Sequence, residues 1–280
     1  MRALSVAFLA LFFGLSALPL AARGLKIAEA KLFGVTTLIE PVDLSWPAYR
    51  DGKFQESFEA SFDERLGFRT HAIRADNELN LRVFRQLGYD PHTGRVLGKD
   101  DYIYDRVYVD SFNRRDDVPI EAIEPRVKSM LALQRYMESR GKTLLVLITP
   151  SKAVLYPEYL PRRMIDREQQ RGPSNYHKLL ILLQRYGVHY FDAQGYLAAL
   201  KGKVPFTLFP NSGIHWGDPA ACEVSARVLE RIGEQLQRRV PRLQCEPYRP
   251  SADLQRDDTD VLDVCNLWSP ERLVRPGFYA

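Results

Sequence analysis

A histidine and a tryptophan share a short loop, "LFPNSGIHWGDPAA" at residues 208–221, which precedes a predicted helix. The imidazole of His215 can act as a general base, because the ordinary pKa of histidine lies near neutral pH. A lone loop histidine can also be a surface or capping residue. Asp218 and Pro219 have the pattern of a helix N-cap followed by the first helical residue, so we expect Asp218 to be structural. His215 is the first candidate for catalysis.

A second group of polar side chains follows a predicted strand, "TLLVLITP" at residues 143–150. Ser151 can be a nucleophile, or it can cap or turn the chain. Lys152 can bind an anion, or it can form a fixed ion pair or position a loop. No Gly-x-Ser-x-Gly elbow surrounds the serine. Asp192 ends the next predicted strand, where it can orient another side chain or cap the helix that follows.

Strands and helices alternate in the second half of the chain, which predicts an α/β fold with a parallel sheet. Residues 143–150 are a continuous apolar run of strand length, typical of a strand buried on both faces. Residues 188–193 are expected to form a second buried strand. A helix is expected between them, with Ser174 as its N-cap and Gly187 at its end. Ligands bind beyond the carboxyl ends of such strands, so the loops holding Ser151 and His215 are both candidate sites.

The first half of the chain predicts helices and one hairpin. Apolar alternation around a Gly-Lys-Asp-Asp turn predicts a β-hairpin over 96–109, and a helix should run from about 119 to 140. The tail after Arg239 shows no further buried strand. One helical stripe of large apolar side chains is expected to face the core: Phe54, Phe58, Phe62 and Leu66.

The N-terminus has the pattern of an export signal. Residues 3–22 carry no charge, follow Arg2, and are long enough to span a bilayer as a helix. A clean small-x-small cleavage site is missing, which favours an uncleaved anchor. We therefore predict a signal peptide or anchor over 1–23, a linker over 24–50, and one domain over 51–280.

Composition excludes some classes of function. The formal net charge is +4 over 280 residues with the basic residues spread out, so nucleic-acid binding is not indicated. The histidines, cysteines and carboxylates are not spaced as the ligands of a metal ion usually are, so we expect no metal and no cofactor. Three late cysteines allow one disulfide and one free thiol, or three buried thiols: Cys222, Cys245 and Cys265.

Four segments, in this order behind the export signal, resemble the alginate O-acetyltransferase family AlgJ/AlgX: residues 51–80, "VLGKDDYIYD" (96–105), "LVLITPSKAVLYPEYLP" (145–161) and 208–221. The resemblance implies an SGNH-hydrolase-like three-layer domain, anchored to the inner membrane and facing the periplasm, that acetylates exopolysaccharides. It also implies a Ser-His-Asp mechanism, in which a serine takes the acetyl group and passes it to a sugar hydroxyl. The expected partners are an acidic exopolysaccharide, an acetyl-donor membrane protein and other exopolysaccharide secretion proteins.

The family's Asp-x-His-Trp block aligns with residues 213–216, so the resemblance makes His215 the base and puts Trp216, Lys152 and Ser151 among the substrate contacts. The aspartate falls on Gly213, so the imidazole must be held another way, at a large expected cost in rate. Nothing after His215 matches the family's Gly-Asp-Ser block.

Two explanations of this incomplete catalytic set stay open. The chain is part of a longer enzyme, or it is an inactive relative that binds polysaccharide or assembles a secretion complex. An exported esterase is a third alternative. With the set incomplete, we expect no hydrolysis of a small acetyl ester.

Overall fold

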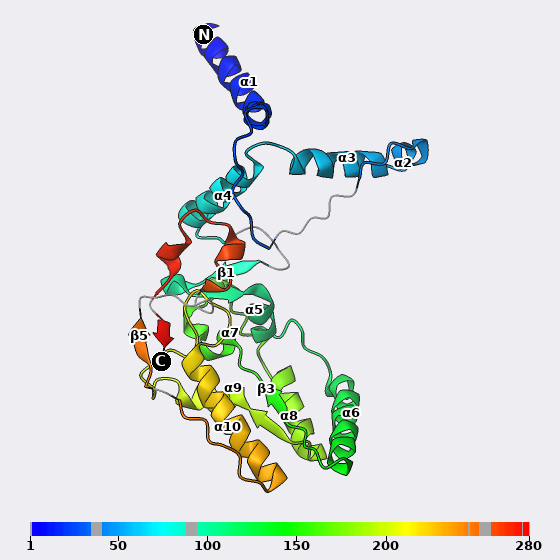
Figure 1. Ribbon diagram of the computed structural model, residues 1–280, viewed down its shortest axis with the longest axis vertical. Coiled ribbons are helices and arrows are strands. Elements are labelled where there is room, and N and C mark those ends of the chain that lie inside the picture. Colours follow the sequence, from blue (N-terminus) through cyan, green and yellow to red (C-terminus); the bar gives the residue numbers. More distant parts are fainter. Residues whose placement is uncertain are drawn as a thin grey trace. The chain divides into compact units, whose positions relative to one another are not determined.

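The computed structural model describes residues 2–34, 41–87, 94–245, 247–251, 259–275 and 277–279 (Figure 1). The chain divides into two compact units. Unit 1 comprises Met1–Arg85 and Asp263–Ser269, and unit 2 comprises Gln86–Leu262 and Pro270–Ala280. The boundaries expected at 23 and 50 stay predictions, and residues 35–40 of the expected linker lie outside the described part.

Unit 1 begins with the apolar helix α1 (Arg2–Gly24). Within it, the segment Leu4–Gly24 is long and apolar enough to cross a membrane, by length and composition alone. Its large side chains are mostly exposed. The predicted apolar segment is thus a continuous helix, which accommodates Pro19 in its last turns.

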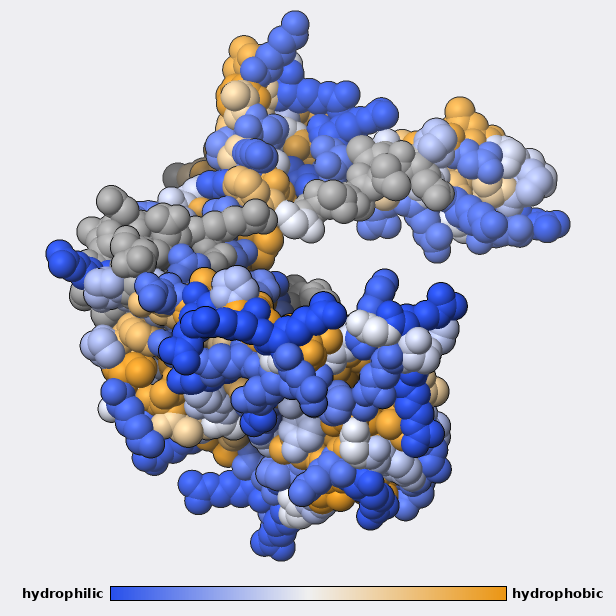
Figure 2. Space-filling model, turned by 60° about the horizontal axis from the view of Figure 1, so that its bottom comes forward, coloured by the Kyte–Doolittle hydropathy of each residue, from blue (hydrophilic) through white to orange (hydrophobic). Residues whose placement is uncertain are grey.

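The aromatic stripe of unit 1 does not face a core. It lies on α3 (Lys53–Glu64), which follows the short helix α2 (Trp46–Arg50). The rings of Phe54, Phe58 and Phe62 stack on one another, with centroid distances of 5.8 and 6.3 Å. Phe58 and Phe62 are 53% and 51% exposed, and hydrophobic atoms are visible on this segment in Figure 2. The core prediction is wrong for them, because their contacts run along the helix.

A carboxylate holds the start of the next helix, α4 (Arg69–Leu79), which a π-helical turn (Asn80–Phe84) extends. Glu29 accepts hydrogen bonds from the amides of Phe68 (2.6 Å) and Thr70 (3.2 Å) and from the Thr70 hydroxyl. Burial raises the pKa of Glu29, but these hydrogen bonds outweigh it and the net pKa is lowered. Glu29 therefore supplies the N-terminal cap that Phe68 lacks.

Unit 2 opens with the predicted hairpin. Strands β1 (Arg95–Leu97) and β2 (Ile103–Asp105) pair antiparallel around a 3-10 turn at Lys99–Asp101. The prediction extended the second strand too far, since residues 107 and 109 lie in the helix α5 (Arg106–Phe112). Asp105 ends the strand because its side chain accepts a hydrogen bond from the amide of Val107, 3.1 Å away, and caps that helix.

The α/β part of unit 2 follows the predicted order. Strands β3 (Val146–Ile148) and β4 (Tyr190–Asp192) pair in parallel, as expected. The helices around them are α6 (Ile120–Ser139), α7 (Lys152–Leu155), α8 (Asn175–Tyr186), α9 (Ala193–Leu200) and α10 (Asp218–Leu236), with 3-10 turns at Pro157–Tyr159 and Arg162–Met164.

The ends of α8 confirm two sequence predictions. Ser174 caps the helix in a capping box with His177, and Gly187 ends it in the left-handed conformation. The helix packs against α6 through a small core that contains Val127, Leu182 and Leu183. Hydrophilic side chains cover much of the face of unit 2 that is turned forward in Figure 2.

The sheets are smaller than predicted. Every sheet among the described residues has two strands, so the three-layer arrangement stays a prediction. Leu147 in β3 is 39% exposed, which contradicts a strand buried on both faces. The tail, expected to have no further buried strand, contributes the short strands β5 (Arg249–Ser251) and β6 (Gly277–Tyr279), which pair antiparallel. In the sequence between them lie 3-10 turns at Asp263–Cys265 and Pro270–Leu273.

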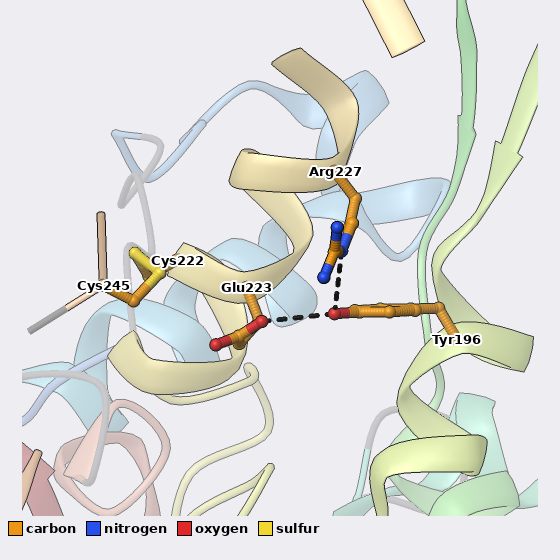
Figure 3. Close-up of a disulfide and its surroundings, with 5 residues drawn as sticks. All are labelled: Tyr196, Cys222, Glu223, Arg227 and Cys245. Carbon is orange, nitrogen blue, oxygen red and sulfur yellow. Dashed lines mark hydrogen bonds between the residues drawn. A yellow bond between two sulfur atoms is a disulfide. The ribbon is translucent and has the colours of Figure 1, made fainter. Parts of the chain in front are cut away.

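A disulfide ties α10 to the tail. Cys222 and Cys245 are bonded (Figure 3). Cys265 is buried and lies outside this disulfide. Beside the disulfide, the hydroxyl of Tyr196 on α9 donates to Glu223, 3.2 Å away, and accepts from Arg227 at 3.3 Å. These contacts join α9 to α10, the two helices on either side of the loop at residues 208–217.

Candidate functional site

The loop between α9 and α10, residues 208–217, is anchored in the main core of unit 2. Leu208 and Phe209 are almost fully buried in that core. The amide of Leu208 donates to the hydroxyl of Tyr156 (3.1 Å), and its carbonyl accepts from the amide of Gly217 (3.0 Å). Gly217 is also the N-cap of α10, so Asp218 is the first helical residue and the predicted cap at Asp218 is wrong by one position.

Lys152 lies beneath this loop and holds its main chain. Its ammonium donates to the carbonyls of Pro210 (2.6 Å), Asn211 (2.8 Å) and Gly213 (2.7 Å). The residue is 2% exposed. Burial lowers the pKa of this ammonium well below its ordinary value, and the charge of Asp260 acts in the opposite direction. All three ammonium hydrogens have acceptors in the loop, so the structure places Lys152 as a support of the loop.

Asn211 ties the same loop to the hairpin and to the tail. Its side-chain amide donates to the carbonyls of Leu273 (2.6 Å) and Asp101 (3.3 Å), and its side-chain oxygen accepts from the amide of Arg275 (3.1 Å). Its backbone carbonyl also accepts from the amide of Ile103 at 2.7 Å. A buried amide with each group satisfied gives the loop one defined position.

His215 has a carboxylate partner. Its ring nitrogen Nδ1 contacts Oδ2 of Asp260, and the other oxygen of that carboxylate accepts from the amide of Ile214 at 3.0 Å. The side chain of His215 is 65% exposed and that of Asp260 is 11% exposed. With its Nδ1 hydrogen held by the carboxylate, the ring keeps Nε2 as the basic atom.

Sequence reasoning missed Asp260. The glycine at position 213 indicated that the imidazole must be held another way, and in this structure the carboxylate of Asp260 contacts it. The partner is 45 positions away, in a tail interpreted as irregular, so no local spacing joins the two residues. The only signal available was the acidic character of that tail.

Trp216 is half-buried and packs against the main core of unit 2. Its neighbour His215 points its ring to Asp260, so the two side chains of this block have different surroundings. The predicted substrate contact at Trp216 stays a prediction.

Ser151 lies at the carboxyl end of β3, where a working side chain was expected. Its hydroxyl is buried, has no hydrogen-bond partner among the described residues, and does not cap α7. It lines a cavity of about 480 Å³, together with residues of α5, α8 and α9. His215 is not among the lining residues, so the structure does not bring the two predicted residues into one cavity.

The remaining acid at a strand end is structural. Asp192 accepts from the amide of Gly195 (2.9 Å) at the start of α9 and from the hydroxyl of Tyr176 (2.6 Å). Burial raises the pKa of Tyr176, and Asp192 adds to this shift. Within the described ranges, no cluster of three or more His, Cys, Asp or Glu side chains could hold a metal ion.

Comparisons with known proteins agree on one family. The family described as "SGNH hydrolase-like domain, acetyltransferase AlgX" matches residues 96–262, which include Lys152, His215 and Asp260. A curated relative, "Probable alginate O-acetylase AlgJ" of Pseudomonas aeruginosa, is 26% identical over 189 residues, which cover 66% of this chain and 44% of the relative. The chain thus spans less than half the length of that protein.

A solved structure, "O-Acetyltransferase Domain of Pseudomonas putida AlgJ", is also similar. It has a TM-score of 0.41 and 20% sequence identity, over 66% of this chain and 63% of that one.

Proposed function

The chain belongs to the AlgX family of acetyltransferases with an SGNH hydrolase-like domain, and from this membership we propose that it takes part in O-acetylation of an acidic, alginate-like exopolysaccharide. The observation that carries the proposal is the contact between His215 and Asp260 inside the matched segment. The choice of polysaccharide follows the relative whose name assigns it to alginate.

In this proposal, His215 is the general base of an acyl-enzyme mechanism. Asp260 holds the hydrogen on Nδ1, so that Nε2 can take the proton of an attacking hydroxyl. In the first half-reaction a serine oxygen bonds to the acetyl carbon, and the donor's leaving group departs with the proton. In the second half-reaction a sugar hydroxyl attacks the acetyl-serine, its proton passes to Nε2 and then to the serine oxygen, and the ester leaves on the sugar.

The serine of this mechanism is not assigned to a residue of the chain, because nothing after His215 matches the Gly-Asp-Ser block of the family. For the purified chain alone we therefore keep the expectation that a small acetyl ester is not hydrolysed. The exposed imidazole suits a polymer, whose hydroxyl can reach it without entering a closed pocket.

The proposed location is the periplasmic face of the inner membrane. The apolar helix α1 would anchor the chain there, with residues 24–50 as linker and 51–280 as the working domain. An acetyl-donor membrane protein and other secretion proteins would then lie within reach.

To test the proposal, the native gene is replaced by a variant gene in cells that produce the polysaccharide. A His215→Ala chain should leave the yield of secreted polymer unchanged and remove most of its O-acetyl groups, measured by NMR of the purified polymer. The matched control is His189→Ala, which removes a partly exposed histidine outside the site.

Two results would overturn this proposal. Normal acetylation with His215→Ala shows that the imidazole is not the base. Lost polymer yield with normal acetylation of the remainder, after deletion of the whole chain, shows a role in assembly.

A further inference from the structure

The cavity next to Ser151 has a lining that suits a ligand. It holds about 480 Å³, which lies in the range of small-molecule sites. It opens among α5, α7, α8 and α9, beyond the carboxyl end of β3, where ligands bind in α/β proteins. The lining residues that matter here are Tyr108, Phe112, Arg114, Asp116, Ser151 and Tyr176.

Within the part of the chain that the structure describes, two buried polar atoms of the lining residues have no hydrogen-bond partner. They are Oγ of Ser151 and Nη1 of Arg114. Buried donors are nearly always satisfied in folded proteins, and each unsatisfied one costs roughly 1–3 kcal/mol. Both residues line one cavity, so a single ligand whose acceptor oxygens reach these two atoms would satisfy both.

Arg114 is held in place by its neighbours. Its φ is +58°, a left-handed conformation that is unfavourable for a residue with a side chain. The buried side chain of Asn113 secures the turn, since its amide donates to the carbonyls of Val109 (3.0 Å) and Met164 (2.6 Å). Its oxygen accepts from the amide of Asp166 at 2.8 Å. The guanidinium is therefore presented by a rigid turn.

The other side of the cavity is the first turn of α8. Ser174, Asn175 and Tyr176 line it there, and the N-terminus of a twelve-residue helix favours negative charge. The side chain of Asn175 joins this turn to the arginine segment, since it donates to the carbonyl of Asp116 (2.8 Å) and accepts from the amide of Val118 (3.1 Å). Both positive features of the cavity are thus fixed relative to each other.

Together, these observations define the chemistry of the ligand. A guanidinium binds a carboxylate through two parallel hydrogen bonds, and a serine hydroxyl can add a third. Asp116 lines the same cavity, and its negative charge disfavours a doubly charged phosphate more than a singly charged carboxylate. The rings of Tyr108, Phe112 and Tyr176 supply apolar faces.

We propose that this cavity binds one carboxylate-bearing sugar unit, a uronate, with its carboxylate on Arg114 and Ser151. The carboxylate preference follows from the cavity itself, whereas the choice of a sugar acid rests on the proposed function. His215 does not line the cavity, so the uronate site is a separate subsite that holds the polymer.

Calorimetric titration of the full chain in detergent tests this site without any acetyl transfer. The probe is a mannuronate trisaccharide, and the same trisaccharide with methyl-esterified carboxyl groups is the neutral comparison. Inorganic phosphate and acetate are titrated separately. The trisaccharide should bind, the ester should bind about tenfold or more weakly, and phosphate should not compete.

Variants identify the side chains. Arg114→Gln and Ser151→Ala should each weaken binding of the trisaccharide, by about tenfold or more for the arginine. Arg115→Gln is the matched control, because that residue pairs with Asp110 and does not line the cavity. Ser151→Ala deletes only a hydroxyl without a partner and keeps the test valid should Arg114→Gln not fold.

The outcomes separate this inference from the proposed function. Unchanged binding in folded Arg114→Gln or Ser151→Ala overturns the site, as does equal binding of the methyl ester. Displacement by phosphate assigns the cavity to a phosphorylated ligand and overturns the uronate. If Arg114→Gln and Ser151→Ala both lose binding of the trisaccharide, and His215→Ala loses acetylation of the polymer, the site and the proposed function are both supported. If the parent chain binds the trisaccharide but His215→Ala still acetylates the polymer normally, the cavity site is supported and only the role of His215 as the base is overturned.

Discussion

One oxygen of the Asp260 carboxylate contacts Nδ1 of His215, and the other accepts a hydrogen bond from the backbone amide of Ile214. One side chain therefore holds both the imidazole ring and the main chain that carries it. The shielded carboxylate positions the exposed imidazole, which is what the proposed role of His215 as a base requires.

Asp260→Asn tests this relationship. An amide cannot hold the Nδ1 hydrogen as the carboxylate does, so the wrong tautomer becomes favoured and the rate of acetyl incorporation should fall about 10,000-fold. The rate is measured in membrane vesicles from producing cells. In ¹⁵N-labelled chain, the downfield NMR signal of the Nδ1 hydrogen should disappear.

Asp263→Asn is the matched control, because it changes an exposed carboxylate three positions away. An unchanged histidine NMR signal in Asp260→Asn contradicts the orienting role. An equal loss of rate in Asp263→Asn would point to a general charge effect.

Lys152→Met should destabilise unit 2. The carbonyls of Pro210 and Gly213 lose this buried donor, while Asn211 keeps the amide of Ile103, so we expect a loss of about 3 kcal/mol in the free energy of unfolding. The urea midpoint monitored by circular dichroism gives the value. Lys203→Met, at an exposed position, should leave the midpoint unchanged. A stable Lys152→Met chain would show that the ammonium does not support the loop.

Reduction of the Cys222–Cys245 disulfide should also lower stability. The bond closes a loop of 23 positions, which corresponds to roughly 3 kcal/mol through the entropy of the unfolded chain. Thermal unfolding with and without a reductant measures the effect. Cys265→Ala should retain the sensitivity to reductant and Cys245→Ser should lose it. A reductant effect that persists in Cys245→Ser contradicts the assigned pair.

Glu29 makes the stability of unit 1 depend on pH. The folded state lowers its pKa, so the unfolded chain binds more protons in acid and the stabilisation is present above the ordinary glutamate pKa of 4.5. It is lost as the pH falls through the lowered value. Glu29→Ala should therefore cost about 1 kcal/mol at pH 7, as the loss of a helix cap does, and little at low pH.

Hydrogen exchange of the first amides of α4 follows this change residue by residue. The neighbouring variant Lys31→Ala leaves the carboxylate contacts intact and should show parental exchange. Equal destabilisation by Glu29→Ala at neutral and at low pH would contradict the capping role.

Local signals predicted much of the fold. Caps and stops are short-range features, so Ser174 and Gly187 could be assigned from sequence, and the parallel pair β3–β4 follows from two apolar runs with a helix between them. The exposure of Phe58 could not be predicted in the same way. A periodic apolar stripe shows which face of a helix is hydrophobic, but not whether a second element covers it.

The candidate site was predictable in part for the same reason. His215 and Lys152 lie in recognisable blocks, yet the direction of a long side chain depends on the packing around it. Lys152 turns inward because three carbonyls converge on its ammonium. Asp260 depends on a contact between distant segments, which no periodicity or spacing in a single sequence encodes.

The way in which Lys152 binds the loop has a consequence for its evolution and redesign. The ammonium donates its hydrogen bonds to carbonyl oxygens, and every residue type has one, so this anchor does not depend on the side chains at 210 and 213. A loop held by its main chain can lose a functional group without losing its path. Residues 213, 214 and 216 can thus be substituted while the backbone still places His215 in contact with the carboxylate of Asp260.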